Sequence, residues 1–351
     1  SLMDKYYTKP CNFYFGRNSI SKIKKKKSLP LHGNSLVSFD TIEIISRKSS
    51  KSLGIAEINS LPKKVKYKVQ QDLKKITQKK NFKNLKFSSS PVLMGIINLT
   101  PDSFSDGGKY KNTNSAYEHS KFLIQKGCKI IDVGGESTRP GSSDINVDLE
   151  WKRIQNFLKK SRGLKSLISV DTRKSKIMHK ANKYKLNLVN DISGLSYDSN
   201  TLEFLKKTNK PFVLNHIKGV PANMQKNPKY KNVVLDIYDF FEEKLKIIRN
   251  KGIKHNNIIL DPGIGFGKNL KHNITILKDI SVFHSLGFPL LLGISRKRFI
   301  KDLSDMNDSK ERIGGTISAS LWSMMLGVQL LRVHDVNEVN QAIKVFKKLN
   351  F

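Results

Sequence analysis

Short apolar runs alternate with amphipathic stretches along the chain from about residue 88 onward. The runs are rich in Val, Ile and Leu without polar alternation, which is typical of parallel strands covered on both faces. The stretches between them have helical spacing, as in residues 116–124 and 237–248. Eight such runs are present, at residues 92–98, 129–135, 167–172, 186–193, 211–216, 258–263, 289–295 and 329–335.

Eight strand–helix repeats over about 260 residues predict an α/β fold in which the strands close into a (β/α)8 TIM barrel. A doubly wound open sheet is the alternative. Closure is favoured because the repeats number eight and the chain carries no dinucleotide-binding glycine motif.

The first 61 residues follow a different pattern. Residues 38–46 partly alternate and predict a strand. Pro62 then begins a helix that runs to about Lys80, with one apolar face made of Val65, Val69, Leu73 and Ile76. We therefore predict three parts: a small appended N-terminal subdomain at 1–61, a linking helix and connector at 62–88, and a catalytic barrel at 89–351.

Each apolar run ends in one to three polar or charged residues. In a (β/α)8 barrel the carboxyl ends of all strands form one rim, and active sites lie there. A single Asp or Asn at a strand end often only caps the next helix, but polar ends on all eight runs indicate a site. Prominent among these residues are Asn98, Asp132, Thr138, Arg139, Asp171, Asn190, Asn215, Asp261, Ser295, Lys297, Arg332 and His334.

Four of these residues, Asp171, Asn190, Asp261 and Lys297, end the third, fourth, sixth and seventh runs. A carboxylate accepts two parallel hydrogen bonds and therefore suits a planar N–H/NH₂ edge. Asn supplies a donor and an acceptor, and Lys can meet a carbonyl or a ring nitrogen. The set predicts a slot for a flat, aminated heterocycle.

A second group comes from the first, second and eighth runs, of which the first and eighth are neighbours in a closed barrel. It contains Asn98, Thr138, Arg139, Arg332 and His334. Two guanidinium groups and a protonated imidazole suit an anion such as a phosphate. The amide oxygen of Asn98 could also bind Mg²⁺ beside that phosphate.

The formal net charge of +35 raises the question of a nucleic-acid or membrane partner. The 64 basic residues are mostly Lys and are spread along the chain, which favours a general compositional bias over a binding stripe. We therefore expect neither partner. The chain has two cysteines, Cys11 and Cys128, and no run of about 18 apolar residues, so we expect a cytoplasmic protein without a transmembrane helix.

Seven motifs resemble those of the dihydropteroate synthases and occur in the order of that family. The match covers about residues 90 to 340 and leaves the first 85 or so outside it. The motifs are MGIINLTPDSFSDGG (94–108), IDVGGESTRPG (131–141), SVDTRK (169–174), NDISG (190–194), LDPGIGFGKN (260–269), GISRK (293–297) and RVHDV (332–336).

The resemblance implies a transferase of folate synthesis. Such an enzyme joins 6-hydroxymethyl-7,8-dihydropterin diphosphate to 4-aminobenzoate and releases diphosphate in an SN1-like substitution. It further implies Mg²⁺ and a homodimer. The implied pterin-binding residues are Asp171, Asn190, Asp261, Lys297 and Asn215, with Asp132 in support.

The resemblance also divides the rest of the rim. Diphosphate would be held by Asn98, Thr138, Arg332 and His334, with Mg²⁺ on Asn98. The 4-aminobenzoate site would be shaped by Phe104, Arg139, Pro140, Phe266 and Ser295. The implied catalytic residues are Asn98, Arg139, Lys297, Arg332 and His334.

Two features within the resemblance lead to further hypotheses. Asn215 stands where the family usually has a Met that packs on the pterin ring, which puts an amide in place of an apolar contact. Residues 100–108 predict a mobile flap hinged at Gly107-Gly108, with Phe104 closing over 4-aminobenzoate.

Two alternative functions remain open from the sequence. A pterin-binding methyltransferase of the same fold would share the pterin carboxylates but would need neither the diphosphate group nor the loops 98–108 and 137–141. An RNA-binding protein would use a basic patch at residues 63–68, which has little aromatic interleaving.

Overall fold

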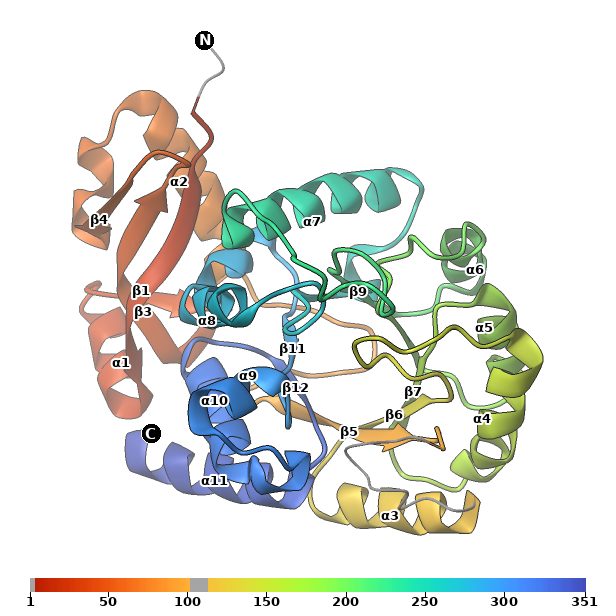
Figure 1. Cartoon of the computed structure of the whole chain (residues 1–351). Helices are drawn as coiled ribbons and strands as arrows, with labels where there is room; N and C mark the ends of the chain where they lie inside the picture. The colour runs from red at the N-terminus through yellow and green to blue at the C-terminus, as the bar shows by residue number, and fades with distance from the viewer. Residues whose placement is uncertain (1–3, 102–112) are drawn as a thin grey trace.

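The computed structural model describes residues 4–101 and 113–351. Its larger sheet has eight parallel strands in the order β10-β9-β8-β7-β6-β5-β12-β11. An isolated parallel bridge between Leu260 and Leu290 joins the two outer strands, and the Leu260 N–H donates to the Pro289 carbonyl oxygen at 2.9 Å. The strands therefore form a nearly closed barrel, as predicted, and the open-sheet alternative is wrong (Figure 1).

The barrel strands lie within the predicted apolar runs and are mostly shorter than them. They are β5 (Val92–Asn98), β6 (Ile130–Gly134), β7 (Leu167–Asp171), β8 (Leu188–Asp191), β9 (Phe212–Asn215), β10 (Ile258–Asp261), β11 (Leu291–Gly293) and β12 (Leu330–Val333). Most of the predicted rim residues belong to the strands themselves, and Asn98, Asp171 and Asp261 are the last residues of β5, β7 and β10. Ser295 and His334 follow the ends of β11 and β12.

Helices follow the strands and cover the outside of the barrel (Figure 1). Several begin at an Asn that caps them: the Asn146, Asn232 and Asn269 side chains accept hydrogen bonds from main-chain N–H groups in the first turn. None of the helices within the described ranges is both long and apolar enough to cross a membrane. The helices are α3 (Thr113–Gln125), α4 (Val147–Ser161), α5 (Ser175–Ala181), α6 (Thr201–Thr208), α7 (Val233–Asn250), α8 (Leu270–Lys278), α9 (Arg298–Ser304), α10 (Ile313–Met325) and α11 (Val336–Asn350).

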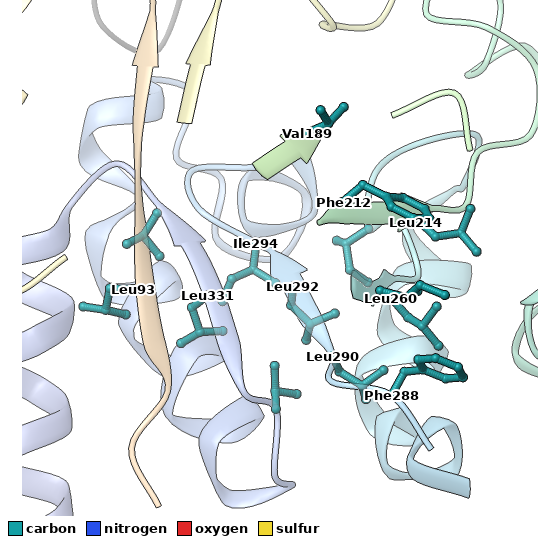
Figure 2. Packing of buried hydrophobic residues seen from close by; sticks show 14 of the residues in the cluster. Leu93, Val189, Phe212, Leu214, Leu260, Phe288, Leu290, Leu292, Ile294 and Leu331 are labelled. Atoms are coloured by element: carbon teal, nitrogen blue, oxygen red, sulfur yellow. The ribbon is translucent and has the colours of Figure 1, made fainter. Parts of the chain in front are cut away.

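Alternate residues of the barrel strands belong to two different apolar clusters. One cluster lies between strands and helices, and Figure 2 shows part of it, including Leu93, Leu292 and Leu331. The other combines residues from opposite sides of the barrel, such as Met94 of β5 and Val213 of β9, so it fills the barrel interior. Its members lie near the amino ends of the strands.

Phe82 closes the amino-terminal end, or base, of the barrel. It is buried in the interior cluster, and Leu85 and Phe87 pack against the same residues. Phe82 also forms a backbone bridge with Leu85, so this connector turns tightly beneath the barrel. The connector between residues 78 and 91 therefore contributes Phe82 to the barrel core, although many of its other residues are exposed.

The N-terminal unit is a small antiparallel sheet. Strand β3 pairs with β1, β2 and β4. The predicted strand at 38–46 is the second half of β3. The elements are β1 (Tyr7–Phe15), α1 (Gly16–Lys24), β2 (Leu29–Leu31), β3 (Asn34–Ile45), β4 (Ser50–Gly54), the 3-10 helix η1 (Ile55–Ser60) and α2 (Lys63–Thr77).

Helix α2 packs on this sheet. Its buried Val69, Leu73 and Ile76 share a cluster with Phe39 and Ile42 of β3. The helix that the sequence predicts from Pro62 thus contributes to the core of the N-terminal unit. The division of the chain at residues 61 and 88 stays a prediction.

The N-terminal unit is docked against the barrel through polar and aromatic contacts. Arg47 donates to Asp236 at 2.6 Å and to Asp239 at 2.9 Å, both on α7. The rings of Tyr7 and Tyr238 meet edge to face with centroids 5.0 Å apart. Figure 1 shows the sheet lying beside the barrel near α7 and α8.

Candidate active site at the carboxyl-terminal rim

Two carboxylates on adjacent strands share one arginine. The Arg332 Nε of β12 donates to the Asp132 Oδ2 of β6 at 2.8 Å, and a terminal nitrogen of Arg332 lies 3.5 Å from the Asp171 Oδ2 of β7. Asp132 also accepts from the Ser169 hydroxyl at 2.7 Å. Burial and the neighbouring Asp132 charge raise the pKa of Asp171 well above its usual range, while Arg332 opposes this shift.

Asn190 lies next to this pair, at the end of β8. Its Nδ2 donates to the Asp132 Oδ2 at 3.2 Å. Its Oδ1 accepts from the Asn215 Nδ2 of β9 at 2.9 Å. Consecutive strands thus bring Asp132, Asp171, Asn190 and Asn215 together, as the sequence predicts for one rim.

Asp261 and Lys297 complete the arrangement on the other side of the rim. Asp261 ends β10 and accepts from the Gly263 N–H at 2.8 Å. Burial raises the pKa of Asp261, with the charge of Lys297 acting in the opposite direction. Burial also lowers the pKa of Lys297 to about 8, and Asp261 limits that fall. The Lys297 Nζ donates to the Ile264 carbonyl oxygen at 2.5 Å.

The turn after β10 places Phe266 beneath Lys297. The Lys297 Nζ lies 4.6 Å from the centroid of the Phe266 ring. Gly263 has a φ of +76°, and a Cβ there would come within 1.9 Å of the His216 carbonyl oxygen. Glycine is therefore required where this loop crosses the end of β9.

His334 and Ser295 form a pair beside Arg332. The Ser295 hydroxyl lies 2.9 Å from the His334 Nδ1 and accepts from the His334 main-chain N–H at 3.0 Å. Burial, with the nearby charges of Arg296, Arg332 and Lys297, lowers the pKa of His334 well below its usual range. This direction disfavours the protonated imidazole considered from the sequence, because burial and the nearby cations all oppose a charge on the ring. Arg139 and Arg332 are the guanidinium groups of this set.

The loop after β6 carries three of the predicted site residues. Thr138 is half-buried, and Arg139 and Pro140 are exposed. The loop is tied at Gly141, whose N–H donates to the Pro221 carbonyl oxygen at 2.7 Å. Phe104 and the rest of the predicted flap from residue 102 onward lie outside the described residues, so the flap stays a hypothesis from the sequence.

A buried ion network under this loop is absent from the sequence-based predictions. Glu136 accepts from Arg173 at 3.0 Å and from the Lys174 Nζ at 3.0 Å. Lys174 also donates to Glu150 at 2.7 Å, and Glu150 accepts from Thr172 at 2.6 Å. Glu136, Arg173 and Lys174 stand inside the motifs 131–141 and 169–174, but no spacing rule predicts that they meet.

A second missed pair lies below the Phe266 turn. Lys268 is fully buried. Its Nζ lies 2.9 Å from the His216 Nδ1 and donates to the Phe266 carbonyl oxygen at 2.8 Å. Burial lowers the pKa values of both Lys268 and His216. The pair ties the end of β9 to the turn that carries Phe266.

Asn98 is the predicted ligand of Mg²⁺. It ends β5, is half-buried, and faces Gly134 across the strand pair. Within residues 4–101 and 113–351, no group of three or more His, Cys, Asp or Glu side chains could hold a metal ion. The amide oxygen of Asn98 is a ligand of the kind that Mg²⁺ prefers.

Comparisons with known proteins agree with this geometry. A family model described as pterin binding enzyme matches residues 94–334. The dihydropteroate synthase of Escherichia coli (strain K12) is 40% identical over 258 residues, which cover 73% of this chain and 91% of that protein.

Solved structures give the same result. A Yersinia pestis dihydropteroate synthase with a sulfonamide drug complex has a TM-score of 0.73 and 36% identity, covering 76% of this chain and 98% of that chain. A Xanthomonas albilineans dihydropteroate synthase with 4-aminobenzoic acid has a TM-score of 0.69 and 34% identity, covering 74% and 93%.

A (β/α)8 barrel with buried carboxylates, amides and a lysine on its rim, matched over residues 94–334, defines a pterin-binding enzyme. Within that class, the chain belongs to the dihydropteroate synthase family, whose members are transferases. The N-terminal unit lies outside the matched residues.

Proposed function

We propose that this chain condenses 6-hydroxymethyl-7,8-dihydropterin diphosphate with 4-aminobenzoate to give 7,8-dihydropteroate and diphosphate, a step of folate synthesis. One observation carries the proposal. Buried Asp171, Asn190 and Asp261, together with Lys297 and Arg332, lie on one rim at the ends of the barrel strands. The names of the relatives support the same reaction.

The pterin ring is assigned to the slot formed by Asp171, Asn190, Asp261 and Lys297. Buried carboxylates accept from the amino and ring N–H groups of the pterin. Asn190 has one N–H and one lone pair beyond those used by Asp132 and Asn215. Lys297, with its pKa near 8, provides a donor that is charged at neutral pH.

Diphosphate is assigned to the neighbouring group of Asn98, Thr138, Arg332 and His334. Arg332 stays charged, because Asp132 and Asp171 raise its pKa. The amide oxygen of Asn98 fits Mg²⁺, which prefers oxygen ligands and usually binds phosphates at the same time. When bound, the ion supplies positive charge to the leaving group.

The reaction is a substitution at the methylene carbon of the pterin. The bond from that carbon to the diphosphate oxygen breaks, and both electrons leave with diphosphate. The bond to the amine nitrogen of 4-aminobenzoate forms, and that nitrogen loses a proton. Departure of diphosphate first leaves a pterin-methyl cation, which the carboxylates of Asp171 and Asp261 stabilise electrostatically.

The aminobenzoate is assigned to the side of the rim formed by Arg139, Pro140, Phe266 and Ser295, with Phe104 as its predicted cover. Phe266 is held in place by Lys297 and by the Lys268–His216 pair. A flat aromatic amine would stack on such a ring while Arg139 faces its carboxylate.

Incubating the protein with both substrates and Mg²⁺ tests the proposal. We expect release of diphosphate and formation of dihydropteroate, and their absence would leave the methyltransferase hypothesis in its place.

Asp171→Asn should weaken pterin binding by about 1–3 kcal/mol, because a donor then faces a donor. Arg332→Ala should slow diphosphate departure by about 100-fold or more. Pterin diphosphate binding of parental strength in Asp171→Asn would contradict the assigned slot.

We further propose a cytoplasmic homodimer with Mg²⁺ as its metal ion and no nucleic-acid or membrane partner. The free Cys11 and Cys128 support a reducing compartment. Light scattering at micromolar concentration tests the dimer, and a filter-binding assay with RNA at about 150 mM salt tests for nucleic-acid affinity.

A further inference from the structure

Asn215 is the residue at which this chain departs from its family's motif, and its surroundings are specific. It ends β9 and is only 3% exposed. Its Nδ2 lies 2.9 Å from the Asn190 Oδ1, 3.0 Å from the Asp191 carbonyl oxygen and 3.4 Å from the Val213 carbonyl oxygen. Three oxygens thus surround one amide nitrogen.

The two main-chain carbonyls determine how the Asn215 amide points. A carbonyl oxygen can only accept a hydrogen bond, so the atom of Asn215 that faces Asp191 and Val213 must be the nitrogen. The atom of Asn190 that meets this nitrogen must then be an acceptor, which is its Oδ1. The backbone of β8 and β9 therefore sets the orientation of a side chain in the pterin slot.

The nitrogen of the Asn190 amide also has an acceptor as its partner. Its Nδ2 faces the Asp132 Oδ2 at 3.2 Å, and this oxygen also accepts from Arg332 at 2.8 Å. A carboxylate that pairs with a guanidinium is an acceptor. An inverted Asn190 would place oxygen against oxygen at Asp132 and nitrogen against nitrogen at Asn215.

We infer that Asn215 is a positioning residue that locks the Asn190 amide in one orientation and thereby determines the hydrogen-bonding pattern the slot shows to a pterin. The inference rests on the proposed pterin-binding function and extends it. The Met expected at this position has no N–H to give, so it would leave the Asn190 oxygen without this partner. The locked amide offers the pterin one N–H and one lone pair in known positions.

A double-mutant cycle on pterin diphosphate binding tests this inference, with dissociation constants measured by calorimetry for the parent, N215M, N190A and the double variant. If Asn215 acts through Asn190, N215M raises the dissociation constant in the parent background. The same substitution has a smaller effect in the N190A background, and the two fold-changes differ by about fivefold to tenfold. Any direct contact of the new Met with the ring appears in both backgrounds and cancels. Equal effects of N215M in the two backgrounds, within about twofold, would overturn the inference.

Asn257→Met serves as the matched control. Asn257 is also buried, and its Nδ2 donates to another asparagine, the Asn209 Oδ1, at 2.7 Å. It precedes β10 at the opposite end of the barrel. We expect it to leave the dissociation constant of pterin diphosphate unchanged, and a loss equal to that of N215M would assign the N215M effect to general destabilisation and refute the inference. A parent protein that binds no pterin diphosphate would instead refute the proposed function.

Discussion

The two ends of the barrel bury different kinds of side chain. At the rim, buried charges are paired with one another, as Asp132 and Asp171 are with Arg332. At the base, Phe82 closes the interior with an aromatic ring. Lys80 is buried nearby, and its Nζ donates a hydrogen bond to the Lys75 carbonyl oxygen.

This difference suggests that the charged rim serves the reaction and that the apolar base serves stability. Buried charges contribute little net stability even when they are well paired, whereas apolar burial is the main favourable term in folding. We therefore expect the rim charges to serve binding and chemistry, while apolar packing at the base stabilises the barrel. Four substitutions would test this division, and they follow from the largest expected effect to the smallest.

Phe82→Ala removes the ring that closes the base. We expect the free energy of unfolding to fall by about 3–4 kcal/mol, because a large buried side chain is lost and a cavity remains. The affinity for pterin diphosphate of the protein that stays folded should not change. Urea unfolding and calorimetry measure the two quantities. Phe122→Ala, at a 42% exposed position on α3, is the control and should cost well under 1 kcal/mol.

Glu136→Gln weakens the ion network that lies under the loop of Thr138 and Arg139. We expect a loss of about 2 kcal/mol in unfolding free energy, because Arg173 and Lys174 keep their charges in a buried place. The KM for 4-aminobenzoate should rise more than the KM for pterin diphosphate, since the loop borders the aminobenzoate side.

Glu203→Gln provides the control for that substitution. Glu203 pairs with Lys207 on the surface of α6, and both side chains are exposed. Its effect on stability should be about 0.5 kcal/mol or less. Equal stability losses for the two glutamates, or equal changes in both KM values for Glu136→Gln, would refute the role assigned to the network.

Lys80→Met removes a buried amine at the base. Burial lowers the pKa of Lys80 to about 7, against an ordinary value of 10.5. Below pH 7 the lysine is charged in both the folded and the unfolded state, and burying the charge lowers the free energy of unfolding. Between pH 7 and 10.5 the unfolded chain binds more protons than the folded protein, so the free energy of unfolding rises with pH. We therefore expect Lys80→Met to stabilise the protein by about 2 kcal/mol at pH 6, and the gain to shrink toward pH 10.

Thermal unfolding at pH 6, 8 and 10 measures this dependence. Lys79→Met, at the exposed neighbouring lysine, is the control and should show no comparable trend with pH. A gain from Lys80→Met that is constant over this range would contradict the lowered pKa.

Arg47→Ala breaks the ion pairs between the N-terminal unit and α7. The Arg47 and Asp239 side chains are 39% and 35% exposed, so solvent screens the attraction. We expect a loss of about 0.5–1 kcal/mol that disappears in high salt. Arg298→Ala is the control, because Arg298 forms a longer, 3.7 Å pair with Asp302 within α9. A loss above about 3 kcal/mol would show that these pairs, and not apolar contacts, hold the unit in place.

The fold was predictable because strand order and periodicity are local properties of a (β/α)8 chain. The run at 92–98 coincides with β5, whereas the run at 186–193 is twice the length of β8 (Leu188–Asp191). Two of the four excess residues precede the strand, and the other two, Ile192 and Ser193, lie in the turn in which Asp191 accepts from the Ser193 N–H. An apolar run alone does not distinguish a strand from the buried turn that follows it.

The candidate site was predictable in its composition. Polar strand ends must share one rim once the barrel closes, so Asp171, Asn190, Asp261 and Lys297 could be grouped from the sequence. The lowered pKa of His334 could not, because it depends on the burial of the ring and on the nearby charges of Arg296, Arg332 and Lys297. Lys268 and His216 were also beyond reach, since 52 residues separate them in the chain.

The sequence by itself determined the eight apolar runs, their polar ends and the family motifs, because each depends on residues close together in the chain. Only the tertiary structure decided that Phe82 closes the base, that Glu136 meets Arg173 and Lys174, and that Asn215 orients Asn190. These contacts join distant segments. Their hydrogen-bond partners and pKa values exist only after closure of the barrel has excluded water and brought donors to acceptors.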